Sequence, residues 1–276
     1  MTAASSAPEQ ISAVPTRLGT LHVRVIGEGR PCVLWPSMFV DSHTWDQLLG
    51  HLAEDRRYLL VDGPGLGLSE PLRRESNIDE AADAATDLLD GLAIAEPVDW
   101  VGNAFGGHVG FKLAIRRGVL RSLVAISAPT EPIAPALRRR IVMLRPLLRA
   151  FGPVGPVRGA ILDAMLTERS QGDPALCRVV LDSLARPDRA SLSAALESFI
   201  LNRADVNHEL SDIAVPSLFI ASDDRGDWSP EDAAAAAART KGARVETVGG
   251  ARTLVPLEQP EAVAALLNGF WDSLRD

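Results

Sequence analysis

Short apolar runs alternate with segments of helical periodicity at both ends of the chain, and this alternation limits the fold more than any other feature. The runs typical of buried strands lie at residues 31–35, 57–62, 97–103, 121–127, 216–222 and 243–249. The helical patterns lie at residues 44–55, 79–92, 105–118, 230–240 and 260–274. Because strand–helix–strand units place their strands in parallel, the alternation predicts a mostly parallel sheet with helices on both faces. Residues 18–29 have the pattern of part of a β-hairpin.

The alternation stops in the middle of the chain, where residues 129–210 carry helical patterns without intervening strands. Leu137, Ile141 and Leu144 are spaced to share one face of a helix. We therefore expect an inserted helical cap in this segment. Proline lacks the backbone N–H that a helix interior needs, so Pro146 should kink or end the first cap helix.

The chain is long enough to bury one large core. The inserted cap separates the residues of this core into two segments of the sequence. We expect residues 15–128 and 211–276 to form the core, after a disordered lead at residues 1–14. The start of the chain lacks the basic region and apolar core of a secretory signal, so we expect a cytoplasmic protein.

The formal net charge of −8 argues against a nucleic-acid-binding surface. No run of about 18 apolar residues is present, so we expect no membrane partner. Cys32 and Cys177 lie far apart in the sequence and are expected to be free thiols. Neither metal-ligand spacing nor a phosphate-binding glycine loop occurs, so we expect no metal and no organic cofactor. The expected partner is a small hydrophobic molecule, and the sequence leaves a homodimer open.

The stretch "VGNAFGGHVG" at residues 101–110 has the pattern G-x-S-x-G of a nucleophile elbow, with alanine in place of serine. Such an elbow is a sharp turn from strand to helix that exposes the central side chain. Gly102 and Gly106 suit this turn, because a side chain at either position would clash. Ala104 occupies the central position and offers a methyl group but no nucleophile.

Four stretches in this order resemble the α/β-hydrolase superfamily, in its lid-bearing branch, over residues 15–274. They are "VLWPSMFVDSHTW", "VDGPGLGLSEP", "VGNAFGGH" and "GGARTLVPLEQPEAV". In the family they correspond to the oxyanion loop, a glycine-rich turn, the nucleophile elbow and the last loop with its helix. The resemblance implies an α/β-hydrolase fold with an eight-stranded sheet and an inserted cap.

The resemblance also assigns the catalytic positions. Ala104 stands at the nucleophile position and Thr253 at the position of the general base, where the family has histidine. A threonine hydroxyl is no base near neutral pH. The acid position falls on Asp224, with Asp227 as the alternative. Two members of a Ser-His-Asp triad are therefore absent.

The oxyanion donors implied by the family are the backbone N–H groups of Met38 and Phe105. His108 is expected to be a packed, hydrogen-bonded histidine one helical turn beyond Ala104. The remaining residues that we expect around the pocket are Trp35, Ser37, Asn103, Trp228 and Arg252.

Three functions are compatible with these residues. The first is a cofactor-free, non-hydrolytic enzyme of the lyase, cyclase or isomerase type, in a biosynthetic setting, that uses the oxyanion site and an aspartate. The second is a non-catalytic protein that binds a ligand. The third is a hydrolase of esters or carbon–carbon bonds whose serine has been replaced by Ala104.

Overall fold

The computed structural model describes residues 9–53, 55–224 and 226–275. Within them, one sheet has the strand order β1-β2-β4-β3-β5-β6-β7-β8. The strands are β1 (Gln10–Thr16), β2 (Gly19–Ile26), β3 (Arg30–Trp35), β4 (Arg56–Val61), β5 (Val98–Asn103), β6 (Leu120–Ile126), β7 (Ser217–Ser222) and β8 (Arg244–Val248). Strand β2 pairs antiparallel with β1 and β4, and the other neighbours pair in parallel. The predicted mostly parallel, eight-stranded sheet is confirmed.

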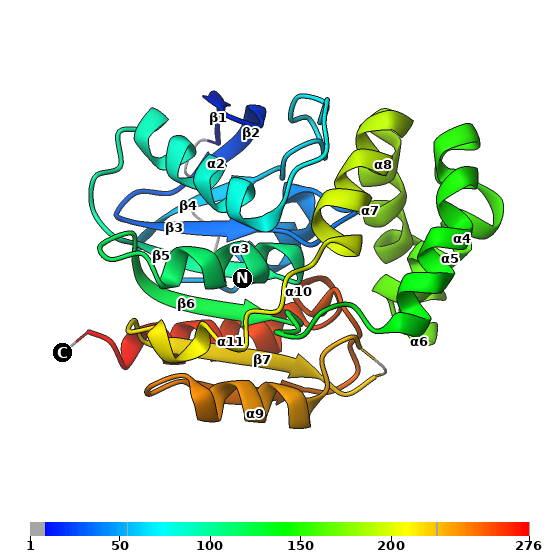
Figure 1. Ribbon diagram of the computed structural model, residues 1–276. Coiled ribbons are helices and arrows are strands. Elements are labelled where there is room, and N and C mark those ends of the chain that lie inside the picture. Colours follow the sequence, from blue (N-terminus) through cyan, green and yellow to red (C-terminus); the bar gives the residue numbers. More distant parts are fainter. Residues whose placement is uncertain (1–8, 54, 225, 276) are drawn as a thin grey trace.

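Helices cover both faces of the sheet (Figure 1). Their bounds are η1 (Ser42–Trp45), α1 (Asp46–Leu49), α2 (Ile78–Gly91), α3 (Phe105–Ala114), α9 (Pro230–Arg239), α10 (Val255–Glu258) and α11 (Pro260–Asp272). Alternate strand residues enter different apolar layers: Val33 and Trp100 pack with α2 and α3, whereas Leu34 and Val101 pack with α1 and α11. Both faces are buried, which is why the strands appear in the sequence as continuous apolar runs.

A group of helices lies between β6 and β7 in the sequence. They are α4 (Pro135–Phe151), α5 (Gly155–Met165), α6 (Glu168–Gln171), α7 (Pro174–Ala185), α8 (Arg189–Leu196) and the π-helical turn η2 (Glu197–Leu201). Figure 1 shows them beyond the ends to which the arrows of β6 and β7 point. A 3₁₀ turn, η3 (Leu210–Asp212), leads back to the sheet. We expected the first of these helices to kink or end at Pro146; helix α4 continues past that proline, so it does not end there, and the kink stays a prediction.

Two boundaries differ from the sequence-based expectation. Gln10–Thr16 forms β1, so the disordered lead expected at residues 1–14 is wrong from Gln10 onward, and residues 1–8 lie outside the described residues. Only Val14 of this strand is buried, because β1 is an edge strand, and such a strand lacks the apolar run of the inner strands. The helix expected at residues 44–55 is shorter and ends at Leu49.

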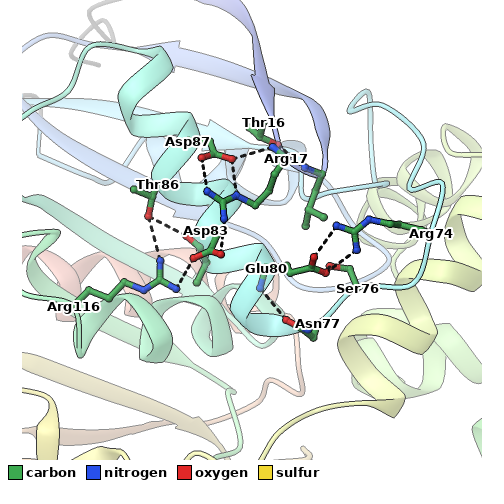
Figure 2. A network of polar contacts seen from close by, with 12 residues as sticks. Thr16, Arg17, Arg74, Ser76, Asn77, Glu80, Asp83, Thr86, Asp87 and Arg116 are labelled. Atoms are coloured by element: carbon green, nitrogen blue, oxygen red, sulfur yellow. Dashed lines mark hydrogen bonds and ion pairs between the residues drawn. The ribbon is translucent and has the colours of Figure 1, made fainter.

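The N-terminal hairpin is tied to the helices by an exposed network around Arg17 (Figure 2). The Arg17 guanidinium donates to Asp87 at 2.9 Å and to Asp83 at 2.6 Å, both on α2. Arg116 at the end of α3 contacts the same Asp83 at 2.9 Å. Exposed pairs of this kind each contribute at most about 1 kcal/mol, so the network orients the hairpin more than it stabilises the fold.

Candidate active site

The elbow has the geometry that its glycines predict. Ala104 lies between β5 and α3 with φ 46° and ψ −102°, an unusual backbone conformation for a residue with a Cβ. A Cβ added to Gly102 would lie 2.1 Å from the Gly106 carbonyl carbon, and one added to Gly106 would lie 2.1 Å from the Trp35 carbonyl oxygen. The turn therefore has no room for a side chain at either glycine.

A cavity of about 480 Å³ opens over Ala104. Its apolar wall comes mainly from α4, α5 and the α8–η2 segment, with Leu137, Ile141, Leu144, Leu148, Val157, Ile161, Met165, Leu196, Phe199 and Ile200. Its polar and charged lining consists of Ser37, His108, Ser127, Arg140, Arg145, Asp163, Arg203, Asp227, Arg252 and Thr253. The cavity thus joins the elbow to the helices between β6 and β7.

Met38 and Phe105 both line the cavity beside Ala104. Met38 follows β3, and Phe105 is the first residue of α3, where backbone N–H groups lack partners within the helix. The neighbouring Ser37 is buried, and its Oγ has no hydrogen-bond partner among the described residues. Met38, Phe105 and Ser37 therefore lie together beside Ala104 in the cavity wall, and the role of oxyanion donor for the first two stays a prediction.

Thr253 lines the cavity, and its Oγ1 donates a hydrogen bond to the Ala164 carbonyl at 2.8 Å. The hydroxyl is thereby tied to α5. The Thr253 carbonyl accepts a hydrogen bond from Asn103 Nδ2 at 2.8 Å, and the same amide donates to Ile126 O at 3.1 Å. Asn103 is fully buried and braces the elbow against the last loop, which corrects its expected place in the pocket wall.

The two candidate acids occupy different positions. Asp227 lines the cavity and forms an ion pair with Arg203. Asp224 is not among the cavity-lining residues, and its Oδ2 lies 3.1 Å from Arg252 Nη2. Arg252 lines the cavity as expected, and it also donates to the main-chain carbonyl of Asp163 on α5. Arg252 therefore connects the loop after β7 with the inserted helices.

The two tryptophans expected in the pocket wall lie beneath it. Trp35 is fully buried, stacks on Trp100 with ring centroids 5.4 Å apart and meets the edge of Phe105 at 6.2 Å. Trp228 is also fully buried and packs against Phe219 at 5.7 Å. Neither is among the lining residues: Trp35 ends β3 and Trp228 lies in the loop between β7 and α9, and both rings point into the core.

His108 reaches the cavity, although its position in the sequence indicated only a packed histidine. Its Nε2 lies 2.9 Å from the Pro129 carbonyl, which accepts a hydrogen bond and assigns the proton to that nitrogen. Burial, together with the nearby charge of Arg203, lowers the pKa of His108 to about 3. The ring is therefore neutral, and its Nδ1 has no partner among the described residues. The available signal was its spacing of one helical turn from Ala104.

The lining combines backbone donors, a neutral imidazole and a carboxylate held by an arginine around a methyl group. No cluster of three or more metal-ligating side chains occurs among the described residues. Within the same part of the chain, no helix is long and apolar enough to cross a bilayer.

Comparison with known proteins identifies the family of this chain and several relatives. The model of a family described as "Alpha/beta hydrolase family" matches residues 32–266. The pimeloyl-[acyl-carrier protein] methyl ester esterase of Xanthomonas campestris pv. campestris is 26% identical over 263 residues, covering 91% of this chain and 98% of that protein. The 2-hydroxymuconate semialdehyde hydrolase of Pseudomonas sp. strain CF600 is 39% identical over 92 residues, so that the match spans only 32% of that protein.

Solved structures agree with the fold. The enol-lactonase of Burkholderia xenovorans LB400 superimposes with a TM-score of 0.84 at 22% identity, covering 95% of this chain and all of that one. An esterase of Thermogutta terrifontis gives a TM-score of 0.83 at 21% identity, covering 97% of this chain and 100% of that chain.

Proposed function

The chain belongs to the alpha/beta hydrolase family, and from that premise we propose that it binds an apolar small molecule over Ala104 without forming an acyl-enzyme. It is related to esterases and other hydrolases. The ester hydrolysis for which the esterase relative is named requires an attacking group, whereas this chain presents a methyl group at the elbow. The helices α4 to α8 act as the cap in this proposal, since α4, α5 and the α8–η2 segment form most of the cavity wall.

One observation carries the proposal: Ala104 keeps the strained elbow conformation and lines the cavity, but it has no oxygen. Thr253, at the position of the base, donates a hydrogen bond from its hydroxyl to Ala164 O, and a threonine hydroxyl is no base near neutral pH. In well-studied triads, losing the nucleophile or the base costs on the order of 10⁶ in rate. Binding and oxyanion stabilisation are the functions that remain.

The chemistry we propose for the site is non-covalent activation of a carbonyl group. The N–H groups of Met38 and Phe105 would stabilise an enolate or alkoxide, each donor contributing about 3–4 kcal/mol in measured cases. Asp227 is the candidate carboxylate that reaches the cavity, and we assign the proton transfer to it in preference to Asp224. An elimination, isomerisation or cyclisation of a small apolar carbonyl compound fits this set.

The experiment compares the natural protein with Ala104→Ser and with Ala104→Ser/Thr253→His, using p-nitrophenyl butyrate in stopped flow and mass spectrometry of the quenched protein. We expect no burst and no acyl adduct for the natural protein. Ala104→Ser alone should remain inactive because no base accepts its proton, while the double variant should gain activity. A burst or adduct with the natural protein would overturn the proposal.

The same series separates the alternatives. Full ester cleavage by Ala104→Ser, without the second change, would favour a hydrolase whose serine has been replaced. Small molecules extracted from the purified protein and incubated with fresh protein distinguish the other two functions. Recovery of the compound unchanged supports ligand binding alone, and recovery of an isomer or elimination product supports the enzyme.

A further inference from the structure

The outer face of helix α4 and the turn into α5 carry most of the exposed large hydrophobic side chains among the described residues. Five of the seven such side chains fall within residues 142–154. Met143 is 79% exposed and Phe151 is 65% exposed. Met143, Leu147 and Phe151 follow one another at intervals of four, which places them in one row on the helix surface. The row is an apolar stripe that the described part of the chain leaves exposed.

The inner face of α4 has its own role, because Leu137, Ile141, Leu144 and Leu148 line the cavity. The outer stripe therefore contributes neither to the core nor to the wall of the cavity. Figure 1 shows α4 and α5 at the extreme end of the molecule, on the side of the inserted helices away from the sheet. Large exposed apolar patches on soluble domains typically mark interaction sites.

The charge of this segment is opposite to that of the rest of the chain. Residues 132–162 contain no aspartate or glutamate and six arginines, which are Arg138, Arg139, Arg140, Arg145, Arg149 and Arg158. Since the whole chain has a net charge of −8, the other 245 residues carry −14. Arg138, Arg139, Arg149 and Arg158 are exposed, and none forms an ion pair within the described residues.

We propose that this face of α4 and the α4–α5 turn docks onto a bilayer surface that contains anionic phospholipids. A cluster of four to eight basic residues on an amphipathic helix is the pattern that attracts such lipids. Apolar side chains among the arginines allow shallow insertion between head groups. An isologous contact with a second copy would bring two strongly positive faces together, so that occupant is disfavoured electrostatically.

Docking of this kind needs no membrane-spanning helix. We expected no membrane partner from the sequence because no apolar run could cross a bilayer, but a surface contact does not depend on such a run. The cavity lies behind the same helix, so docking would bring its wall close to the apolar phase. The proposal does not depend on the chemistry assigned to the cavity, and its test uses no cavity ligand.

The test is co-sedimentation of the full chain with vesicles of phosphatidylcholine alone and of equimolar phosphatidylcholine and phosphatidylglycerol. We expect binding to the anionic vesicles that weakens with added salt, and little binding to the neutral ones. The variant Arg138→Gln/Arg139→Gln/Arg149→Gln should lose affinity by about 100-fold at low salt, at about five-fold for each arginine. The natural protein should keep part of its vesicle binding at high salt, through its apolar side chains. The variant Met143→Ser/Leu147→Ser/Phe151→Ser should lose this part.

Control variants remove the same number of charges, and two exposed apolar side chains, elsewhere on the surface. Arg30→Gln/Arg73→Gln/Arg117→Gln changes three exposed arginines outside the segment, and Ile11→Ser/Leu68→Ser changes the other two exposed large hydrophobics. Both should bind as the natural protein does. Circular dichroism and thermal unfolding check that all variants fold, which is expected because every substituted side chain is partly or fully exposed.

A second readout follows insertion directly. All five tryptophans of the chain are buried, so Phe151→Trp adds the only exposed indole. Its emission should shift to shorter wavelength with anionic vesicles and be quenched by brominated lipid. The proposal is overturned by absence of binding, by equal binding to neutral vesicles, or by equal losses in the controls. A dimer that the serine variant abolishes, without vesicle binding, would assign the face to a second copy and likewise overturn it.

Discussion

At the scale of single residues, the elbow shows how a backbone conformation can persist without the side chain for which it is suited. Ala104 has positive φ, and its N–H donates to Ile126 O at 2.7 Å while its carbonyl accepts from His108 N at 3.0 Å. These hydrogen bonds from β6 and α3 hold the residue in a conformation that costs on the order of 1–3 kcal/mol. The surrounding fold, and not the residue, determines the turn.

Replacing Ala104 by glycine should therefore stabilise the protein. Glycine adopts positive φ without the clash of a Cβ, so Ala104→Gly should raise the free energy of unfolding by about 1 kcal/mol. Urea denaturation followed by circular dichroism measures the change. Ala235→Gly, at an exposed position in the middle of α9, is the matched control and should cost about 1 kcal/mol. Equal destabilisation by both changes would show that the elbow is unstrained.

His108 should produce a specific acid sensitivity. Its pKa falls from an ordinary value of 6.5 to about 3 in the folded chain, because burial and Arg203 disfavour its charged form. Between these values the unfolded chain binds a proton that the folded chain excludes, so stability decreases as pH falls from about 6.5 towards 3, by up to about 1.4 kcal/mol per pH unit.

Denaturation midpoints across this pH range, for the natural protein and for His108→Gln, measure the contribution. Glutamine retains an N–H that can donate to Pro129 O, but it does not titrate. The free energy of unfolding of the variant should depend less steeply on pH. The difference in slope should correspond to the uptake of about one proton per chain on unfolding. Identical slopes would place His108 in contact with water.

At the scale of elements, an ion pair joins the inserted helices to the loop after β3. Arg186, the C-cap of α7, pairs with the buried Asp41, whose Oδ1 also accepts from His43 N at 3.1 Å at the start of η1. Burial, followed by the nearby charge of Asp62, raises the pKa of Asp41. The loop that carries Met38 is thus held, at Asp41, by the inserted helix α7.

Arg186→Met should destabilise the protein by about 3 kcal/mol at neutral pH, because it leaves a buried carboxylate unpaired. The loss should shrink as pH falls through the raised pKa of Asp41, since the protonated acid needs no partner. Adding Asp41→Asn should recover much of the stability at neutral pH. Chemical denaturation of the natural protein and of both variants over pH measures these effects, and a deficit independent of pH would contradict the explanation.

At the scale of the whole molecule, Glu258 connects the last loop of the core with the inserted helices. One carboxylate oxygen accepts from Thr167 N at 2.8 Å, and the other accepts from Arg252 N at 2.7 Å. Thr167 is the N-cap residue of α6. The Glu258 side chain therefore positions both the inserted helices and the loop that contains Thr253. This double contact gives a physical reason for a glutamate at this point of the motif.

Glu258→Ala should lower the free energy of unfolding by about 3 kcal/mol, because two hydrogen bonds to a charged group are lost. Limited proteolysis should also cut the inserted helices sooner. Glu258→Gln keeps one good acceptor, so its free energy of unfolding should lie between those of the natural protein and Glu258→Ala. The exposed Glu261, in the first turn of α11, is the control, and Glu261→Ala should cost under about 1 kcal/mol. Similar losses at both positions would refute the bridging role.

The sequence by itself determined the order of strands and helices, the parallel sheet and the elbow. These follow from local causes: two-sided burial produces continuous apolar runs, and a backbone contact within a few residues excludes any side chain at Gly102 and Gly106. The same local patterns missed β1, because an edge strand carries a weaker signal than an inner strand. They also left open whether the helix would kink or end at Pro146, and α4 continues past that proline.

Only the tertiary structure decided which polar groups meet. That His108 and Asp227 line the cavity, while Trp35 and Asn103 lie beneath it, depends on the directions in which strand ends and cap helices pack. Arg252 meets Asp163 across 89 residues of sequence. Such contacts arise from the closure of long loops around the sheet, and no periodicity or motif along the chain encodes their distances.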